Sequence, residues 1–417
     1  MADDDSSIDS AWYEGANRSK RVADALARNH LDALVALTPE NAEYLSGRAS
    51  TIATLWRLPG LVAVAVNGRG ETAVAAGDQE VAFYQRAVAR FPHPLWIEHL
   101  DLRPAGAGLL DRVTAARPEG QLDRPAQFDP DRLLDAVAAA VRAVAGDGTR
   151  IGAEASLLPA WIAAGLRERL PAVELIDAVA IFDDLRAIKD ADEIAQLRLA
   201  AELTEIGIAA ARDSLHPGMS ALAVSAAYQR AIWNAAAGDA RYSAMRQVEG
   251  LVSVGDGSRP AVVGPGETVK LDMQVDVGGY HSDVGRTYAL EPTPEQQQVY
   301  DALRHALETA IGAVAPGVPF ADVWRAGTAA MREAGFTNYS RGHLGHSVGL
   351  AHNYEEPPFI AADETRPLAP DMVISVELPY YLLGIGSFQM ERMVVVGEDG
   401  HEVLDRLPFR LDGTSRA

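Results

Sequence analysis

Residues 269–288 read VKLDMQVDVGGYHSDVGRTY: an alternating apolar and polar run, two adjacent glycines, and a second strand-like run. This pattern predicts two antiparallel strands joined by a tight turn, because glycine readily adopts the positive φ angles that hairpin turns require. A turn centred between Gly278 and Gly279 makes Asp272 the partner of Gly285. Because side chains alternate between the faces of a sheet, Asp283 is then expected on the same face as Asp272.

A second pair of carboxylates is predicted in a later hairpin. Glu377 lies in the apolar run 372–378 and Glu391 in the apolar run 388–396, at equal distances along the chain from Gly384. A turn at Gly384 would make the two glutamates direct neighbours on adjacent strands. The aspartate pair by itself could face solvent. The apolar flanks of the glutamates predict burial, and buried charges need a partner or a metal ion.

A metal-binding nitrogen is expected from residues 341–352, RGHLGHSVGLAH, which hold three of the ten histidines. Four carboxylates with one imidazole suit Mn²⁺, Co²⁺, Fe²⁺ or Zn²⁺. The absence of cysteine excludes thiolate ligands and cysteine nucleophiles. Four carboxylates favour two ions about 3.5–4 Å apart, which would share a water and lower its pKa towards neutrality.

The 417 residues exceed the ~250–300 at which one core usually divides, which predicts two domains. Alternating helical and extended segments up to residue 182 predict an α/β layer, whereas long helices apart from antiparallel hairpins after residue 184 predict an α+β domain. The helices expected in the first part are 19–29, 39–45, 129–144 and 159–170, and the strands are 31–37, 61–66, 71–75 and 150–154. In the second part we expect helices at 190–215, 221–237, 294–314 and 320–334, and a strand-rich block at 251–290.

Charge and hydropathy narrow the expected partners. The chain has 37 Lys+Arg against 58 Asp+Glu, a net charge of −21, which disfavours binding to nucleic acid. The most apolar stretch, residues 133–145, contains Arg142 and is shorter than the ~20 residues of a membrane span. The N-terminal residues MADDDSSIDS do not resemble a secretory signal. A cytoplasmic enzyme or binding protein is therefore expected, and the family resemblance described next implies a small-molecule or short peptide substrate.

These motifs together resemble the pita-bread metallopeptidases, the family of Xaa-Pro aminopeptidase, prolidase, methionine aminopeptidase and creatinase. The family's D-x₁₀-D hairpin matches Asp272 and Asp283, its G-H-x-x-G-L block matches residues 345–350, its glutamate strand matches residues 371–379, and its last glutamate matches Glu391. Residues 31–47 are similar to the creatinase-type N-terminal domain. The resemblance implies a creatinase-type α/β N-terminal domain over 1–183, a pita-bread catalytic domain over 184–417, and a homodimer.

The resemblance also implies roles for five residues. Asp272 would bind one metal ion, Asp283 and Glu391 would bridge two ions, and His346 with Glu377 would complete the second site. Glu377 would in addition carry the catalytic proton between the attacking water and the leaving nitrogen. Two divalent ions are implied, Mn²⁺ first, and a hydroxide bridging them would attack the carbon of a C–N bond.

Substrate-contacting residues are less well matched to the family. The family's substrate-facing histidine falls at Asn353, so His352 is expected to take its catalytic role after a one-residue shift, and His343 is a further candidate substrate contact. In creatinase-like dimers a loop of the N-terminal domain reaches the neighbouring catalytic site. Trp56 and Arg57 are the candidates for that contact here.

Four functional hypotheses are compared. An Xaa-Pro peptidase-like metallohydrolase is favoured because this activity is the most common one in the family that the chain resembles. A specialised hydrolase of a cyclic amidine or guanidino compound, similar to ectoine hydrolase, is favoured by the lack of histidine in residues 255–270 and by Gln389, where prolidase-like members carry arginine. A non-catalytic pita-bread binding module is opposed by the five filled ligand positions. A serine hydrolase is opposed by the absence of a G-x-S-x-G motif.

Overall fold

The computed structural model describes residues 16–84, 87–92, 106–115, 127–350 and 355–413. The chain forms two compact units, residues 1–185 and 186–417, and each is described by itself. The boundary was expected after residue 183, and the units divide after Leu185. Both positions fall inside helix α7 (Val179–Ala187). Within the described residues, every helix is too short or too polar to span a bilayer.

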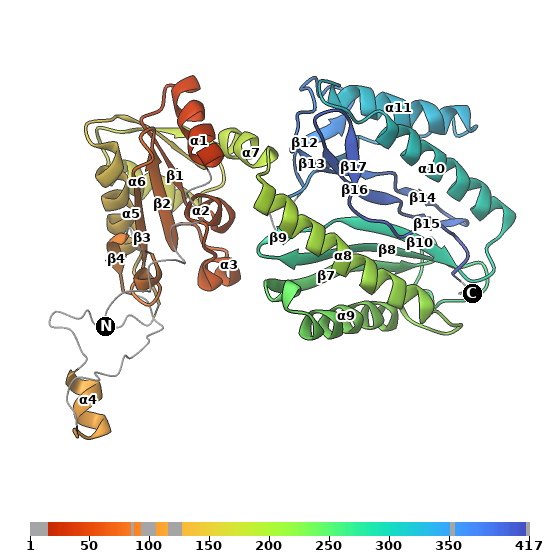
Figure 1. Cartoon of the computed structure of the whole chain (residues 1–417), viewed down its shortest axis with the longest axis horizontal. Helices are drawn as coiled ribbons and strands as arrows, with labels where there is room; N and C mark the ends of the chain where they lie inside the picture. The colour runs from red at the N-terminus through yellow and green to blue at the C-terminus, as the bar shows by residue number, and fades with distance from the viewer. Residues whose placement is uncertain (1–15, 85–86, 93–105, 116–126, 351–354, 414–417) are drawn as a thin grey trace. The chain divides into compact units, whose positions relative to one another are not determined.

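The N-terminal unit is built around a six-stranded sheet with the strand order β4-β3-β2-β1-β5-β6 (Figure 1). Its strands are β1 (Ala33–Ala36), β2 (Val62–Asn67), β3 (Thr72–Gly77), β4 (Ala87–Phe91), β5 (Arg150–Ala153) and β6 (Glu174–Asp177). Its helices, besides α7, are α1 (Ala16–Arg28), α2 (Pro39–Ser46), α3 (Thr51–Trp56), α4 (Leu109–Ala115), α5 (Pro130–Ala145) and α6 (Ala160–Arg169). The predicted α/β layer is confirmed, because strands and helices alternate along this part of the chain and the strands form one mixed parallel and antiparallel sheet.

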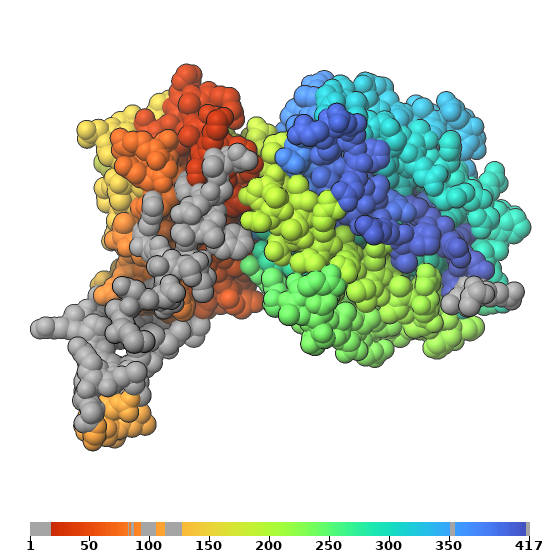
Figure 2. Space-filling model, viewed as in Figure 1, coloured from red at the N-terminus to blue at the C-terminus, as the bar shows by residue number. Residues whose placement is uncertain are grey.

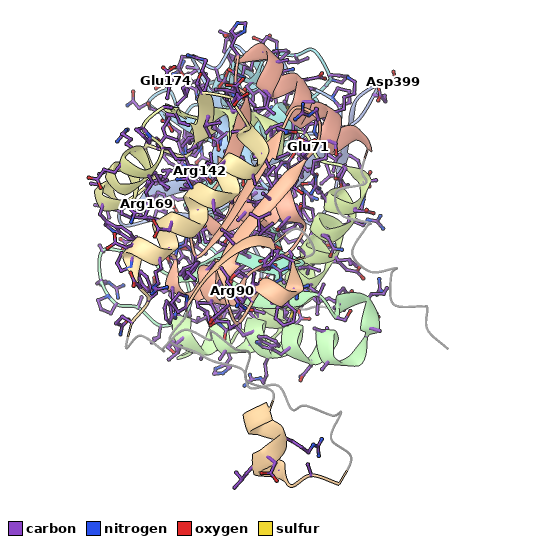
Figure 3. All side chains as sticks on the ribbon, turned by 90° about the vertical axis from the view of Figure 1, so that its left-hand side faces the viewer. Glu71, Arg90, Arg142, Arg169, Glu174 and Asp399 are labelled. Carbon is purple, nitrogen blue, oxygen red and sulfur yellow. The ribbon has the colours of Figure 1, made fainter. Side chains whose placement is uncertain are left out.

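Helix α5 closes one side of this sheet. Its apolar face, including Leu133, Val137 and Val141, shares one buried cluster with strands β1, β2 and β3. Arg169 of α6, labelled in Figure 3, pairs with Asp131 of α5 at 2.8 Å and with Asp135 of α5 at 2.6 Å. These pairs are partly exposed and contribute little, so apolar burial provides most of the packing energy.

The C-terminal unit contains two larger sheets and a short hairpin. One sheet has the order β10-β8-β7 with β9 beside β8, and the other has the order β12-β11-β13-β16-β17. The first comprises β7 (Met245–Val254), β8 (Thr268–Val277), β9 (Tyr280–His281) and β10 (Val284–Ala289). The second comprises β11 (His343–Ser347), β12 (Glu356–Ala361), β13 (Val373–Glu377), β16 (Glu391–Val396) and β17 (His401–Val403). The short hairpin is β14 (Tyr380–Leu382) and β15 (Gly386–Phe388).

Four helices cover the outer faces of these sheets. Helices α8 (Ala191–Asp213) and α9 (Ala221–Gly238) pack on β8 and β7, while α10 (Pro294–Gly312) and α11 (Phe320–Glu333) pack on β13 and β12. In Figures 1 and 2, α8 and α9 form part of the outer surface of this unit. Helices outside and sheets inside agree with the pita-bread architecture, and the α+β prediction is confirmed.

Local sequence signals explain where the long helices begin. Asp190 accepts a hydrogen bond from the Glu193 backbone at 3.0 Å, and the Glu193 carboxylate accepts one from the Asp190 backbone at 2.7 Å. Thr293 and Gln296 form the same reciprocal box at the start of α10. Each box satisfies N–H groups that have no partner within the first helical turn, so both helices have well-defined starting points.

Both predicted strand registers are confirmed. Asp272 pairs with Gly285 between β8 and β10, and Val277 pairs with Tyr280 across the predicted turn. Glu377 pairs directly with Glu391 between β13 and β16. The hairpin β14–β15 continues that register around Gly384, as expected.

The two sheets approach each other closely at Gly285. A Cβ atom built on Gly285 would lie 2.9 Å from the Cβ of Glu391, and closer still to the Gln389 side chain. Within the second sheet Gly345 has φ +129°, and a Cβ there would overlap the carbonyl oxygen of Ser375. Only glycine leaves room for the neighbouring backbone and side chains at these two positions.

Arg286 holds strands β10 and β16 together at the same place. Its guanidinium is fully buried and lies 2.5 Å from Asp405. It also donates to the carbonyl oxygens of Glu391 at 2.7 Å and Leu407 at 2.8 Å. A buried pair with further hydrogen bonds is costly to break, and removing one partner typically costs about 3–5 kcal/mol. Arg286 therefore connects β10 to the backbone of β16.

We expect Gly285→Ala to lower the free energy of unfolding by about 2 kcal/mol, because the added methyl group would separate β10 from β16. Gly312→Ala, at the end of α10 where a Cβ meets nothing within 4 Å, is the matched control. Urea denaturation of the three proteins measures the difference. Equal destabilisation by both substitutions would show that close sheet contact at Gly285 is not required.

Candidate metal centre

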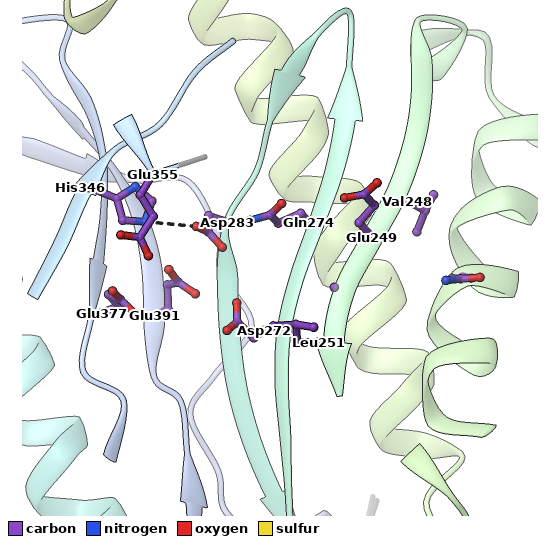
Figure 4. A pocket seen from close by; sticks show the side chains of 12 residues that line it. Val248, Glu249, Leu251, Asp272, Gln274, Asp283, His346, Glu355, Glu377 and Glu391 are labelled. Atoms are coloured by element: carbon purple, nitrogen blue, oxygen red, sulfur yellow. Dashed lines mark ion pairs between the residues drawn. The ribbon is translucent and has the colours of Figure 1, made fainter. Parts of the chain in front are cut away.

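One cavity in the C-terminal unit collects all five predicted ligand residues. It has a volume of about 560 Å³, and its walls come from both sheets (Figure 4). Asp272 on β8 and Asp283, just before β10, lie on one side, and three residues of the second sheet face them. Those three are His346 on β11, Glu377 on β13 and Glu391 on β16.

Three of these side chains are close enough to share one ion. Single ligand atoms of Asp283, His346 and Glu391 all lie within 4.8 Å of one another. His346 Nε2 lies 3.4 Å from Asp283 Oδ2, while Nδ1 lies 2.9 Å from the carbonyl oxygen of Ser347. A carbonyl can only accept, so Nδ1 carries the proton in that bond and Nε2 faces the acidic cavity. This orientation is typical of metal-binding histidines.

Asp283 supports the same interpretation. Its Oδ1 is buried and has no hydrogen-bond partner among the described residues. An unsatisfied buried carboxylate oxygen is unfavourable unless a proton or a cation neutralises it. The donors around it are oxygens and one imidazole nitrogen, a set that fits Mn²⁺, Co²⁺, Fe²⁺ or Zn²⁺.

The pKa values of the site residues are shifted as expected for a metal-free cluster. Burial, reinforced by the charges of Asp272 and Glu377, raises the pKa of Asp283 to about 6. Burial and three neighbouring carboxylates raise the pKa of Glu391 well above its usual value. Burial disfavours the imidazolium of His346, but the hydrogen bond and charge of Asp283, the Ser347 carbonyl and the charge of Glu377 together outweigh burial and raise the pKa of His346 to about 9. Protons therefore stabilise the cluster in the absence of a metal.

Gln389 lies two residues before Glu391, and its amide contacts both glutamates of the hairpin. Its Nε2 donates to Glu377 Oε2 at 3.0 Å and to Glu391 Oε2 at 3.2 Å. The amide therefore lies between two cross-strand carboxylates and lowers their mutual repulsion. Ser375 donates to the other oxygen of Glu391 at 2.7 Å.

A second group of side chains surrounds Glu377. Its Oε1 lies 3.5 Å from His343 Nδ1 and 3.3 Å from Arg341 Nη2. His343 Nε2 lies 3.3 Å from Glu355 Oε2. The structure thus places the predicted substrate residue His343 beside the cavity. Arg341 and Glu355 have no role predicted from the sequence, although both lie in or close to the histidine-rich segment.

The other three predicted substrate residues are His352, Trp56 and Arg57. His352 lies in 351–354, outside the described residues. Trp56 and Arg57 end helix α3 in the N-terminal unit, where Arg57 Nη2 lies 3.5 Å from Glu40 Oε1. Because the two units are described separately, the predicted contact of Trp56 and Arg57 with a neighbouring site stays a prediction.

Comparison with known proteins places the cavity within a matched region. The model of metallopeptidase family M24 matches residues 195–398. A probable dipeptidase PepE of Mycobacterium bovis is 30% identical over 65% of this chain and 72% of its own length. A putative dipeptidase YkvY of Bacillus subtilis is 29% identical over 58% of this chain and 67% of its own. The sequence alignments thus span about two thirds to three quarters of these relatives.

Solved structures extend the similarity over nearly the whole chain. Dipeptidase PepE from Mycobacterium ulcerans superposes with a TM-score of 0.71, at 25% identity, covering 97% of this chain and 98% of its own. An Xaa-Pro dipeptidase from Bacillus anthracis superposes with a TM-score of 0.74, at 20% identity, covering 95% and 99%. The second likeness concerns the fold alone. Together they confirm a pita-bread unit preceded by an N-terminal domain.

We expect the metal-free protein to lose stability as the pH rises from about 4 to about 6. A carboxyl group with a raised folded pKa favours folding below its unfolded pKa of about 4, and loses that contribution as the pH passes its folded pKa. For Asp283 the upper limit is about 6. Thermal unfolding with a chelator, compared with Asp283→Asn, isolates this contribution. Identical pH slopes for the two proteins would contradict the raised pKa.

Proposed function

Because this chain belongs to metallopeptidase family M24, we propose that it is a dinuclear-metal hydrolase cleaving a C–N bond in a small, Xaa-Pro-like peptide substrate. Membership of this family indicates that the protein is a metal-dependent hydrolase. The observation that carries the finer proposal is the arrangement of four carboxylates and one imidazole around one cavity, with ligand atoms of three of them within 4.8 Å. Their donor chemistry suits two divalent cations, with Mn²⁺ proposed first.

The proposed ligand roles are those that the family resemblance implies. Asp272 would hold one ion, His346 with Glu377 would hold the other, and Asp283 and Glu391 would be shared by both. The unsatisfied Oδ1 of Asp283 and the cavity-facing Nε2 of His346 support these assignments. When bound, two such ions supply Lewis acidity and lower the pKa of a coordinated water.

Glu377 is proposed as the residue that moves the proton. Its Oε2 accepts from Gln389, and its Oε1 faces His343 and Arg341 at 3.5 Å and 3.3 Å. A carboxylate held from both sides keeps a fixed orientation towards the cavity. It can take a proton from the attacking water and deliver it to the leaving nitrogen. Glu377 itself is 6% exposed, which limits the access of bulk water to its carboxylate.

A cyclic amidine or guanidino compound is the second candidate substrate, and the cavity wall favours it in one respect. Among the described residues that line the cavity there is no lysine or arginine, whereas Glu249 and Glu355 line it together with the candidate ligands. Such a wall attracts a cationic group and provides no positive charge for a substrate carboxylate. Gln389 likewise carries no charge.

We expect Asp283→Ala to lose bound Mn²⁺ and to lower activity at least about 100-fold, because it removes a carboxylate shared by both metal positions. Asp301→Asn, on the exposed face of α10, is the control and should retain both. Metal analysis and hydrolysis of Xaa-Pro dipeptides, ectoine and guanidino acids are the measurements. A folded wild-type protein that binds no metal would overturn the proposal, and hydrolysis of guanidino acids alone would discard the Xaa-Pro assignment.

We further propose a homodimer in which Trp56 and Arg57 contact the neighbouring site, as the family resemblance implies. The Trp56→Ala/Arg57→Ala double variant should then raise KM while metal content stays at two ions per chain. Light scattering measures the oligomeric state, and steady-state kinetics measures KM. A monomeric wild-type protein with full activity would contradict this arrangement.

A further inference from the structure

Lys270 is a buried cation beside a proposed metal ligand. It precedes Asp272 by two positions on β8, so both side chains lie on the same face of the strand. Its Nζ lies 3.1 Å from Asp272 Oδ2, and the residue is 5% exposed. Only three of the 37 basic residues in the chain are lysines, so a lysine at this position is unusual for this sequence.

The surroundings of Lys270 leave Asp272 as its ion-pair partner. The residues opposite Lys270 on the adjacent strands are Ser253 and Thr287, which carry no charge. On the remaining side the ring of Tyr381 on β14 lies 5.7 Å from Nζ. Within the described part of the chain, Asp272 is the one carboxylate within 4.0 Å of this ammonium group.

This contact affects both the shape and the charge of the metal position. One oxygen of Asp272 accepts from Lys270, which leaves Oδ1 as the oxygen without that contact. The ammonium also offsets the negative charge that would attract a cation. Because Lys270 is enclosed by protein, solvent and salt screen it weakly. Arg341, which contacts Glu377 but does not line the cavity, is about a quarter exposed and is screened more strongly.

We propose that the positive charge of Lys270 lowers the affinity of the protein for the divalent ion bound through Asp272. This inference rests on the proposed dinuclear function. Lys270 acts through Asp272 and is a positioning residue, since it does not line the cavity. The consequence is that the ion next to Asp272 binds more weakly than it would to the same carboxylates without the lysine.

Calorimetric titration of the metal-free full-length protein with Mn²⁺ tests this proposal. Lys270→Met removes the charge and the hydrogen bond, Lys270→Gln removes the charge but keeps a donor, and Lys270→Arg keeps the charge. We expect both uncharged variants to tighten the weaker Mn²⁺ step at least about tenfold, and Lys270→Arg to remain close to wild type. The matched control is Arg198→Met, which removes an exposed cation from α8.

Each outcome of the titration decides one hypothesis. Unchanged or weaker Mn²⁺ binding by folded Lys270→Gln would overturn the proposal that the charge of Lys270 lowers metal affinity. Weaker binding would show that Lys270 only orients Asp272. If Lys270→Met does not fold, as judged by circular dichroism, Lys270→Gln and Lys270→Arg still separate charge from hydrogen bonding. A wild-type protein that binds no Mn²⁺ would refute the dinuclear function itself, before the variants are compared.

Discussion

Repulsion among four carboxylates in one buried cavity is the constraint on which the C-terminal unit depends. Such a cluster is unfavourable by itself, so the protein must hold its two halves together by other contacts. The bare backbone of Gly285 lets β10 approach β16, and Arg286 joins the same two strands through Asp405 and the Glu391 carbonyl. The apolar clusters behind the sheets then supply the burial energy that offsets the charge.

The protein distributes compensating groups around the cavity. His346 contacts Asp283, Gln389 bridges Glu377 and Glu391, and Lys270 contacts Asp272. Neutral donors lie between the glutamates, whereas a full charge lies beside Asp272. This difference separates the two ends of the cavity chemically, although their carboxylates are of the same kind. Such groups influence metal affinity without being ligands.

The comparisons establish the family and the fold more firmly than the substrate. Relatives named as dipeptidases share about 30% of their residues with this chain, and the fold is shared over nearly its full length. The walls of the cavity include the acidic residues Glu249 and Glu355, which are not among the candidate metal ligands. Substrate choice depends on such wall residues, because the metal ligands are compatible with several kinds of C–N bond.

Much of the site could be predicted from sequence because each carboxylate pair belongs to a local hairpin. The two-residue period of a strand and a glycine turn set the pairings Asp272–Gly285 and Glu377–Glu391, and both are confirmed. Segments with weak periodicity were missed. Helix α3 was not predicted, because its six residues span fewer than two helical turns and show no clear period.

Contacts between hairpins required the tertiary structure. Arg341 lies next to Glu377 in space, but no local spacing relates the two side chains, because their segments meet only when β11 pairs with β13. The sequence by itself determined the fold class, the two hairpin registers and the types of ligand. The folded chain alone decided which neighbours adjust their charges, since electrostatic interactions depend on distances between segments far apart in sequence.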